Sequence, residues 1–158
     1  MSHSIIDTQL AVAAEDLNDA RRGLQQTLDY LREQGQPWAF SDVQRIVEEP
    51  YVIGKMGDLQ IRIDLAAALL ERAQTLESSP EPRLIASTEA VIASADALLA
   101  VDNVQYELTG QRQSLPPQTG REPLRWHYQV LGNHRLNGVT PPQLQERLHV
   151  PSNSPQCL

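Results

Sequence analysis

The residues of this chain whose types and spacing could do chemistry include a pair of histidines in its C-terminal third. His127 and His134 lie seven positions apart, so on a helix they share one face. Two imidazoles can begin a metal site, but no third ligand stands at a suitable spacing. The pattern therefore favours packed or solvated side chains over a metal site. With Arg125 and Tyr128 beside it, His127 could still provide acid–base or anion contacts in a larger assembly.

A second candidate for metal binding is Glu146-Arg147-Leu148-His149, which has the Glu-x-x-His spacing. A carboxylate-bridged di-iron centre needs two such pairs and two further glutamates on facing helices. One pair cannot build that centre, so we predict no metal site in the chain. The sequence also contains no Ser-His-Asp arrangement, no phosphate-binding glycine loop and no dinucleotide-binding fingerprint. From these patterns we assign no catalytic residue.

Gly-Lys-Met-Gly at 54–57 has the Gly-x-x-Gly spacing of the RNA-binding loop in KH domains. Strands should follow such a loop, whereas residues 64–76 are rich in alanine and leucine at helical spacing. The formal charge of -7, from 13 Lys and Arg against 20 Asp and Glu, would repel a phosphate backbone. We therefore predict that Gly54 and Gly57 share a helix face, where they permit a close helix crossing. An RNA-binding module is the rival interpretation, and we expect no nucleic-acid partner.

The elements that must position these residues are helices. Aromatic residues make up only 4% of the chain, and without aromatic and β-branched runs strands are hard to build. Apolar residues recur instead at steps of three and four, which predicts helices over 5–34, 50–76, 83–109 and 123–136. We therefore predict an all-α protein: an antiparallel four-helix bundle at 1–142, followed by a tail at 143–158 with one turn around 144–148.

Each long helix has a predicted buried stripe. In the first helix Ser4 and Asp7 form a capping box, and leucines recur every seven residues, as in bundles with shallow crossing angles. The stripes are Ile6, Leu10, Ala13, Leu17, Ala20, Leu24, Leu28 and Leu31; then Ile53, Met56, Leu59, Ile63, Ala66, Leu70, Ala73 and Leu76; then Leu84, Thr88, Val91, Ala95, Leu98 and Leu99.

Composition also bears on location. The single cysteine, Cys157, can form no internal disulfide. Residues 1–7 contain no basic region followed by an apolar run, and the longest apolar stretch, 65–70, is too short to span a membrane. We expect a soluble cytoplasmic protein with no membrane partner.

Three stretches resemble the acyl-CoA-dehydrogenase-like flavin monooxygenases of sulfur acquisition, the branch whose members oxidise dibenzothiophene or dimethyl sulfone. The first runs from Ala-Arg-Arg-Gly-Leu at 20–24 to Gln-Pro-Trp at 36–38, and the second from Glu-Glu-Pro-Tyr at 48–51 to Ala-Ala-Ala-Leu-Leu at 66–70. The third and most specific combines Pro-Leu-Arg-Trp-His-Tyr at 123–128 with Leu-Gly-Asn at 131–133 and Leu-Asn-Gly at 136–138. Together they cover about 5–142.

The resemblance implies the C-terminal helical domain of that family. There, this domain makes tetramer contacts and closes one side of the flavin and substrate pocket, and a separate reductase supplies the reduced flavin. FMN or FAD is thus the implied cofactor. Arg125, Trp126 and His127 are the implied cofactor-binding residues, and the implied partners are further copies of this chain and a chain that supplies the missing domains.

The chain departs from the family in two ways. The family's N-terminal helical domain and middle β-domain, which supply much of the flavin site, are absent. In addition, only residues 111–122 join the third and fourth helices, where the family has roughly twenty further residues, a very long connection. That segment usually carries a histidine near the substrate, and no residue here matches it. We therefore expect a chain that holds no flavin alone and is incomplete as a catalyst. The alternative is a non-enzymatic oligomerising helical bundle that has lost the flavin chemistry.

Overall fold

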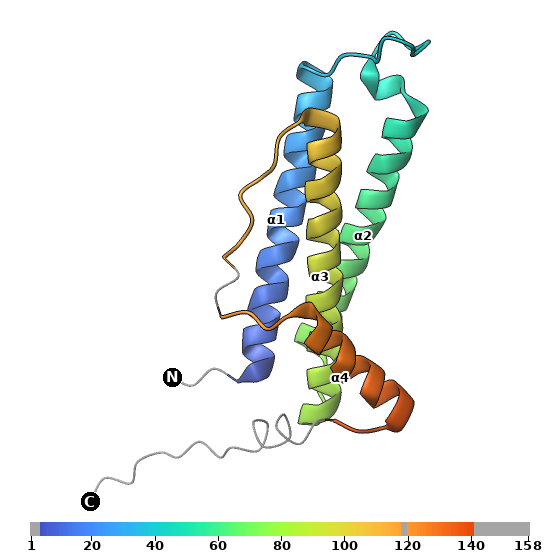
Figure 1. The fold of residues 1–158 in the computed structure, drawn as a ribbon. Coiled ribbons are helices and arrows are strands. Elements are labelled where there is room, and N and C mark those ends of the chain that lie inside the picture. The colour runs from blue at the N-terminus through green and yellow to red at the C-terminus, as the bar shows by residue number, and fades with distance from the viewer. Residues whose placement is uncertain (1–3, 118–119, 141–158) are drawn as a thin grey trace, which may run out of the picture.

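The computed structural model describes residues 4–117 and 120–140 and consists of three long helices and a shorter fourth (Figure 1). These are α1 (Ile5–Glu33), α2 (Pro50–Thr75), α3 (Pro80–Thr109) and α4 (Leu124–Asn137), with a short 3-10 turn, η1 (Ile46–Glu48), before α2. The described ranges contain no strand, so the predicted all-α class is confirmed. The predicted tail, its turn at 144–148 and the Glu146–His149 pair lie outside the described residues.

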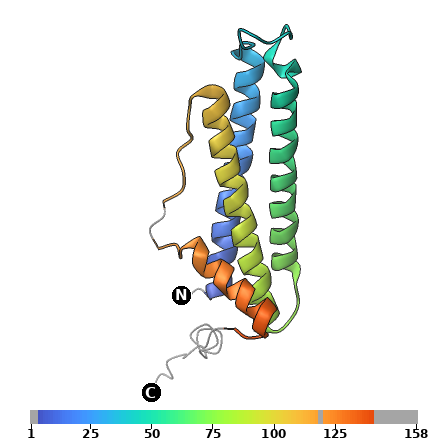
Figure 2. The same ribbon diagram turned by 45° about the vertical axis from the view of Figure 1, so that its right-hand side comes forward.

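The long helices form an up-down-up arrangement with α3 in the middle. Figures 1 and 2 show α1 and α3 running in the same direction and α2 running against them. The most extensive contact joins α1 to α3, the next joins α2 to α3, and α1 and α2 touch less. The short helix α4 lies obliquely across the end of the bundle where α1 and α3 begin (Figure 2). It packs there through Val130, which is buried with Ile6 and Leu84.

Helix ends follow local chemistry. The Asp7 backbone N–H donates to Ser4 Oγ at 3.1 Å, which confirms the predicted cap of α1. Helix α3 begins at Pro80, three residues earlier than predicted. Proline lacks only an N–H that has no partner in the first turn, so Pro80 and Pro82 are both tolerated there. Gly110 and Gly138 end α3 and α4 in the left-handed region, with φ of 72° and 68°.

The predicted stripes form the core, with two errors. Most of the first stripe is buried, Leu10 and Leu28 only partly. In α2 the buried positions run from Val52 through Leu59 and Ile63, whereas Ile53 is 56% exposed. In α3 Leu98 is buried but Leu99 is 48% exposed. Both errors arise where two apolar residues are adjacent, because helical spacing then allows either of them to face the core.

The glycines correct a further prediction. No atom lies within 4 Å of the position that a Cβ would take at Gly54 or Gly57, so the close helix crossing predicted there is wrong. The crossing is instead at Gly23, where a Cβ would lie 2.8 Å from Val101 Cγ1. Small residues thus permit the close approach of α1 to α3, while Gly54 and Gly57 lie exposed within the continuous helix α2.

Helix α3 is the one helix in the described part of the chain that is long and apolar enough to cross a membrane, by length and composition alone. Of its most apolar window, 61% is buried inside the bundle. Contacts with α1 and α2 account for that apolar character, since a central helix buries residues on more than one side.

Candidate functional site

The three implied cofactor-binding residues begin α4 and point to different sides of it. Consecutive helical residues are turned about 100° from one another, and Arg125 is exposed while Trp126 is half-buried. Trp126 packs against the cluster formed by Ile6, Leu84 and Val130. His127 is 5% exposed. The structure therefore does not bring the three side chains onto one surface, and their contact with a flavin stays a prediction.

His127 is buried as a neutral imidazole. Burial lowers its pKa, because the charged form loses hydration, and the carboxylate of Glu122 opposes this shift without cancelling it. His127 Nδ1 has no hydrogen-bond partner among the residues described. A buried neutral imidazole with a free ring nitrogen suits packing, or one hydrogen bond to an added group, better than acid catalysis at neutral pH.

Arginines surround the short connection between α3 and α4, and two of them are paired. Arg121 bonds to Asp16 at 2.7 Å and also to Glu15, and so ties the connection to α1. Burial raises the pKa of Asp16, and Arg121 opposes that rise. Arg112 bonds to Asp102, which is almost fully buried on α3. Arg125 has no carboxylate partner within the described ranges, so it is the cation of this group that remains available to an anion.

The histidine pair does not form a metal centre. His134 is partly exposed, with its Nε2 3.9 Å from Glu81 Oε1, whereas His127 is buried. No group of three or more His, Cys, Asp or Glu side chains able to hold a metal ion is found in residues 4–117 and 120–140. His127 therefore packs in the interior, and His134 lies at the surface beside Glu81.

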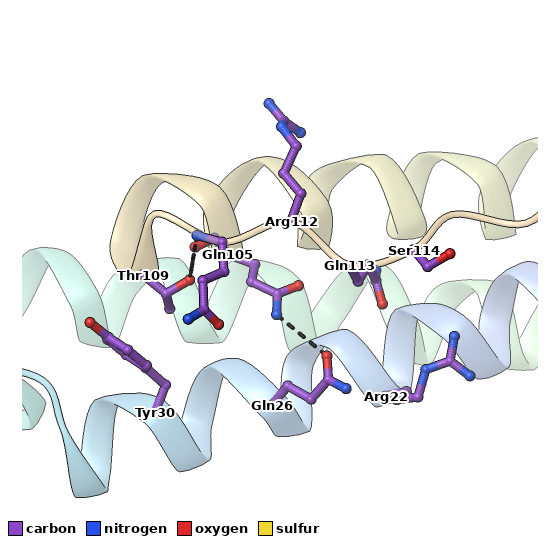
Figure 3. Close-up of a pocket in the computed structure, with 9 residues that line it drawn as sticks. Arg22, Gln26, Tyr30, Gln105, Thr109, Arg112, Gln113 and Ser114 are labelled. Carbon is purple, nitrogen blue, oxygen red and sulfur yellow. Dashed lines mark hydrogen bonds between the residues drawn. The ribbon is translucent and has the colours of Figure 1, made fainter.

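A second candidate site lies at the opposite end of the bundle from α4. Residues 111–117, which we call the strap, leave the end of α3 and run back beside it (Figure 1). Between α1, α3 and the strap is a hollow of about 440 Å³. Figure 3 shows Gln105 of α3 and Gln26 of α1 pointing toward one another across it, with Gln105 Nε2 donating to Gln26 Oε1 at 3.4 Å.

This hollow was not predicted from the sequence. Its lining consists of four glutamines, two arginines and one each of threonine, serine and tyrosine. These residues come from α1, α3 and the strap, and no spacing pattern marks them. The one signal was the connection at 111–122, which is shorter than the resemblance implies and so has less slack to stand away from the helices that it joins.

No protein-family model matches the chain, but it has relatives in sequence. It is 29% identical over 153 residues to a dibenzothiophene monooxygenase of Mycolicibacterium goodii, and 28% identical over 157 residues to one of Rhodococcus erythropolis. These alignments cover 82% and 84% of this chain, but only 37% and 38% of the relatives. The chain thus spans well under half the length of the curated relatives that it matches.

Solved structures show the same fold. FMN-bound TdsC from Paenibacillus sp. A11-2 matches with a TM-score of 0.72 at 22% identity, over 86% of this chain and 40% of that one. The methanesulfinate monooxygenase MsuC from Pseudomonas fluorescens matches with a TM-score of 0.65 at 24% identity, over 85% and 41%. The acyl-CoA-dehydrogenase-like helical fold and the resemblance to the dibenzothiophene monooxygenase branch are therefore confirmed.

Proposed function

We propose that this chain acts as the C-terminal helical domain of an acyl-CoA-dehydrogenase-like flavin monooxygenase and is incomplete as a catalyst on its own. The observation that carries the proposal is the asymmetry of the matches. The alignments cover over four fifths of this chain but about 38% of its relatives. A tight cofactor site must bury most of its ligand and supply a few placed polar groups. One helical wall provides only part of such an enclosure.

The implied flavin, FMN or FAD, fits this chain only through Arg125. A flavin nucleotide carries phosphate, which favours a guanidinium or a helix N-terminus. Arg125 is exposed and lies in the first turn of α4, so both features coincide there. Trp126 and His127 pack inward, and they would shape the wall rather than contact one flat ring. When bound, the flavin would supply the oxygen-activating chemistry. No residue of the chain is assigned a catalytic role.

Cofactor retention tests the proposal. The purified chain is mixed with excess FMN or FAD, and the free cofactor is removed. The cofactor that stays bound is then measured by absorbance and calorimetry. We expect no retained flavin and no oxidation of dibenzothiophene when a flavin reductase is added. A stoichiometric yellow complex of submicromolar affinity would overturn the proposal and indicate a compact flavoprotein. Recovery of flavin binding with a second chain that provides the rest of the flavin site would identify the partner that we expect.

The second candidate function is a non-enzymatic oligomerising bundle, and the outer face of α2 favours it. Ile61 and Leu65 are 69% and 56% exposed. On the helix they lie beside Gly54, Gly57 and Ala68, which are exposed as well. A contiguous apolar face of this kind is typical of an interaction surface. We propose that it pairs with a second copy of this chain, and that the protein is cytoplasmic and binds neither nucleic acid nor membrane.

A further inference from the structure

Helix α4 is held on the bundle by few buried side chains. Of its 14 residues only His127 and Val130 are buried, and the helix lies across the end of the bundle rather than within it (Figure 2). Its apolar contact is the small cluster of Ile6, Leu84 and Val130, with Trp126 packed beside it. A helix of this length is marginal in water without packing. The docked position of α4 therefore depends on a small interface.

One of the two buried side chains of α4 is an imidazole. His127 is 5% exposed and lies three residues before Val130, so both face the side that packs on Ile6 and Leu84. A proton on His127 places a positive charge in this interface, at a cost in hydration. Glu122, on the connection before α4, favours the charged form, but burial outweighs it and lowers the pKa of His127. No charged group of α1 or α3 within the described ranges adds to this balance.

Polar contacts hold the other end of α4, and they respond to acid in the opposite direction. His134 Nε2 lies 3.9 Å from Glu81 Oε1, and the two side chains are 39% and 50% exposed. Thr140 Oγ1 donates to the same Glu81 Oε1 at 2.7 Å. Exposed ion pairs of this kind contribute little to stability. A proton on His134 strengthens its pairing with Glu81 and so favours docking, whereas a proton on His127 opposes it.

We propose that α4 is an acid-released helix, which docks on the bundle while His127 is neutral and leaves it, with α1–α3 still folded, when the imidazole takes up a proton. The docked state lowers the pKa of His127. Docking is therefore fully favoured above the ordinary pKa of about 6.5 and is lost as the pH falls through the lower pKa of the docked state. Release uncovers the apolar side chains of Ile6, Leu84 and Val130. The helix thus couples a change in pH to the exposure of an apolar surface.

This inference does not rest on the proposed flavin role. Arg125 lies in the first turn of the same helix, so release of α4 also withdraws the residue that the proposed function assigns to the flavin. The position of α4 can nevertheless be measured on the chain without any flavin. Failure of the acid release and failure of the proposed function are therefore separate results.

Tryptophan emission measures the docking of α4 on the whole chain. The protein has two tryptophans, Trp38 and Trp126, and Trp38→Phe leaves Trp126 of α4 as the only one. As the pH is lowered from about 8 to about 5, we expect the emission of Trp126 to shift to the red reversibly and its quenching by acrylamide to increase. Far-UV circular dichroism should lose no more signal than α4 contributes, because α1–α3 stay helical.

Histidine variants in the Trp38→Phe background assign the transition. His127→Leu and His127→Gln cannot be charged, and both should keep the emission of Trp126 unshifted down to about pH 5. His134→Gln is the control, and it should still release α4, at an equal or slightly higher pH, because the contact with Glu81 no longer strengthens in acid. Circular dichroism at about pH 8 checks that the variants fold. No shift of emission with His127 present, a shift that coincides with loss of the whole helical signal, or the same shift in the folded His127 variants would each overturn the proposal.

Discussion

A methyl group added at Gly23 would enter the tightest part of the contact between α1 and α3. An alanine Cβ there would lie 2.7 Å from Gln113 Nε2 and 2.8 Å from Val101 Cγ1. The end of a glutamine side chain can move aside at little cost. Val101 is fully buried and β-branched, so its side chain has almost no alternative rotamer on a helix. Gly23→Ala must therefore displace α1 or α3 slightly.

The magnitude follows from two opposing effects. Overpacking of this kind costs about 1–3 kcal/mol, and replacing a mid-helix glycine by alanine returns about 0.5–1 kcal/mol. We expect Gly23→Ala to lower the free energy of unfolding by about 1 kcal/mol. Gly57→Ala is the matched control, because no atom lies within 4 Å of its Cβ position. It should raise the free energy of unfolding by about 0.5–1 kcal/mol.

Urea unfolding followed by far-UV circular dichroism measures both variants, at a concentration where the chain is monomeric. Adding Gln113→Ala to Gly23→Ala removes one of the two close contacts, and most of the loss should persist because Val101 remains. If Gly23→Ala stabilises the chain as much as Gly57→Ala does, the close packing of α1 on α3 is refuted.

Three further outcomes are expected. Leu59→Ala should lower the free energy of unfolding by about 2–5 kcal/mol, because Leu59 is fully buried; a loss near zero in urea unfolding would contradict the α2 stripe. Burial lowers the pKa of His127 in the folded chain, so its contribution to stability is present above the unfolded pKa of about 6.5 and is lost as the pH falls through the folded pKa. The free energy of unfolding of the wild-type chain should decline below about pH 6.5. The decline should be less steep in His127→Gln and unchanged in the control His134→Gln. Identical slopes in all three proteins would argue against a buried neutral imidazole. Ile61→Glu should shift the light-scattering mass toward monomer, and a wild-type chain that is monomeric at every concentration would count against self-association through α2.

Much of the fold was predictable because its signals are local. The Ser4–Asp7 cap and the leucine repeat specify α1 without reference to any other element, and Pro50 marks the start of α2. Ile53 and Leu99 were misplaced because each has an apolar neighbour, and only the packed partner helix decides between the two. Local sequence patterns therefore predict the helices, whereas contacts between helices decide which face of each helix is buried.

The candidate sites depended more on contacts between distant segments. Arg125 was implied by a sequence resemblance; it is exposed, and its contact with a flavin stays a prediction. The inward packing of His127 was not predictable, because one helix turn offers no information about which side α3 occupies. The hollow under the strap depends on the contact between Gly23 of α1 and Gln113 of the strap. Spacing along the chain does not predict that contact.

The parallel pairing of α1 with α3 also has a consequence for how the chain acquires its structure. The two helices are bridged by the bond from Ser87 Oγ to Gln9 Oε1 at 2.5 Å, which joins residues 78 positions apart. Closing so long a loop costs entropy before the contact returns any stability, and distant contacts slow folding relative to bundles whose sequential helices pair. During synthesis α1 leaves the ribosome long before α3 exists. Until α3 emerges, only the smaller contact with α2 can cover the leucine stripe of α1. The nascent chain is therefore exposed to aggregation, or to capture by a chaperone, during that interval.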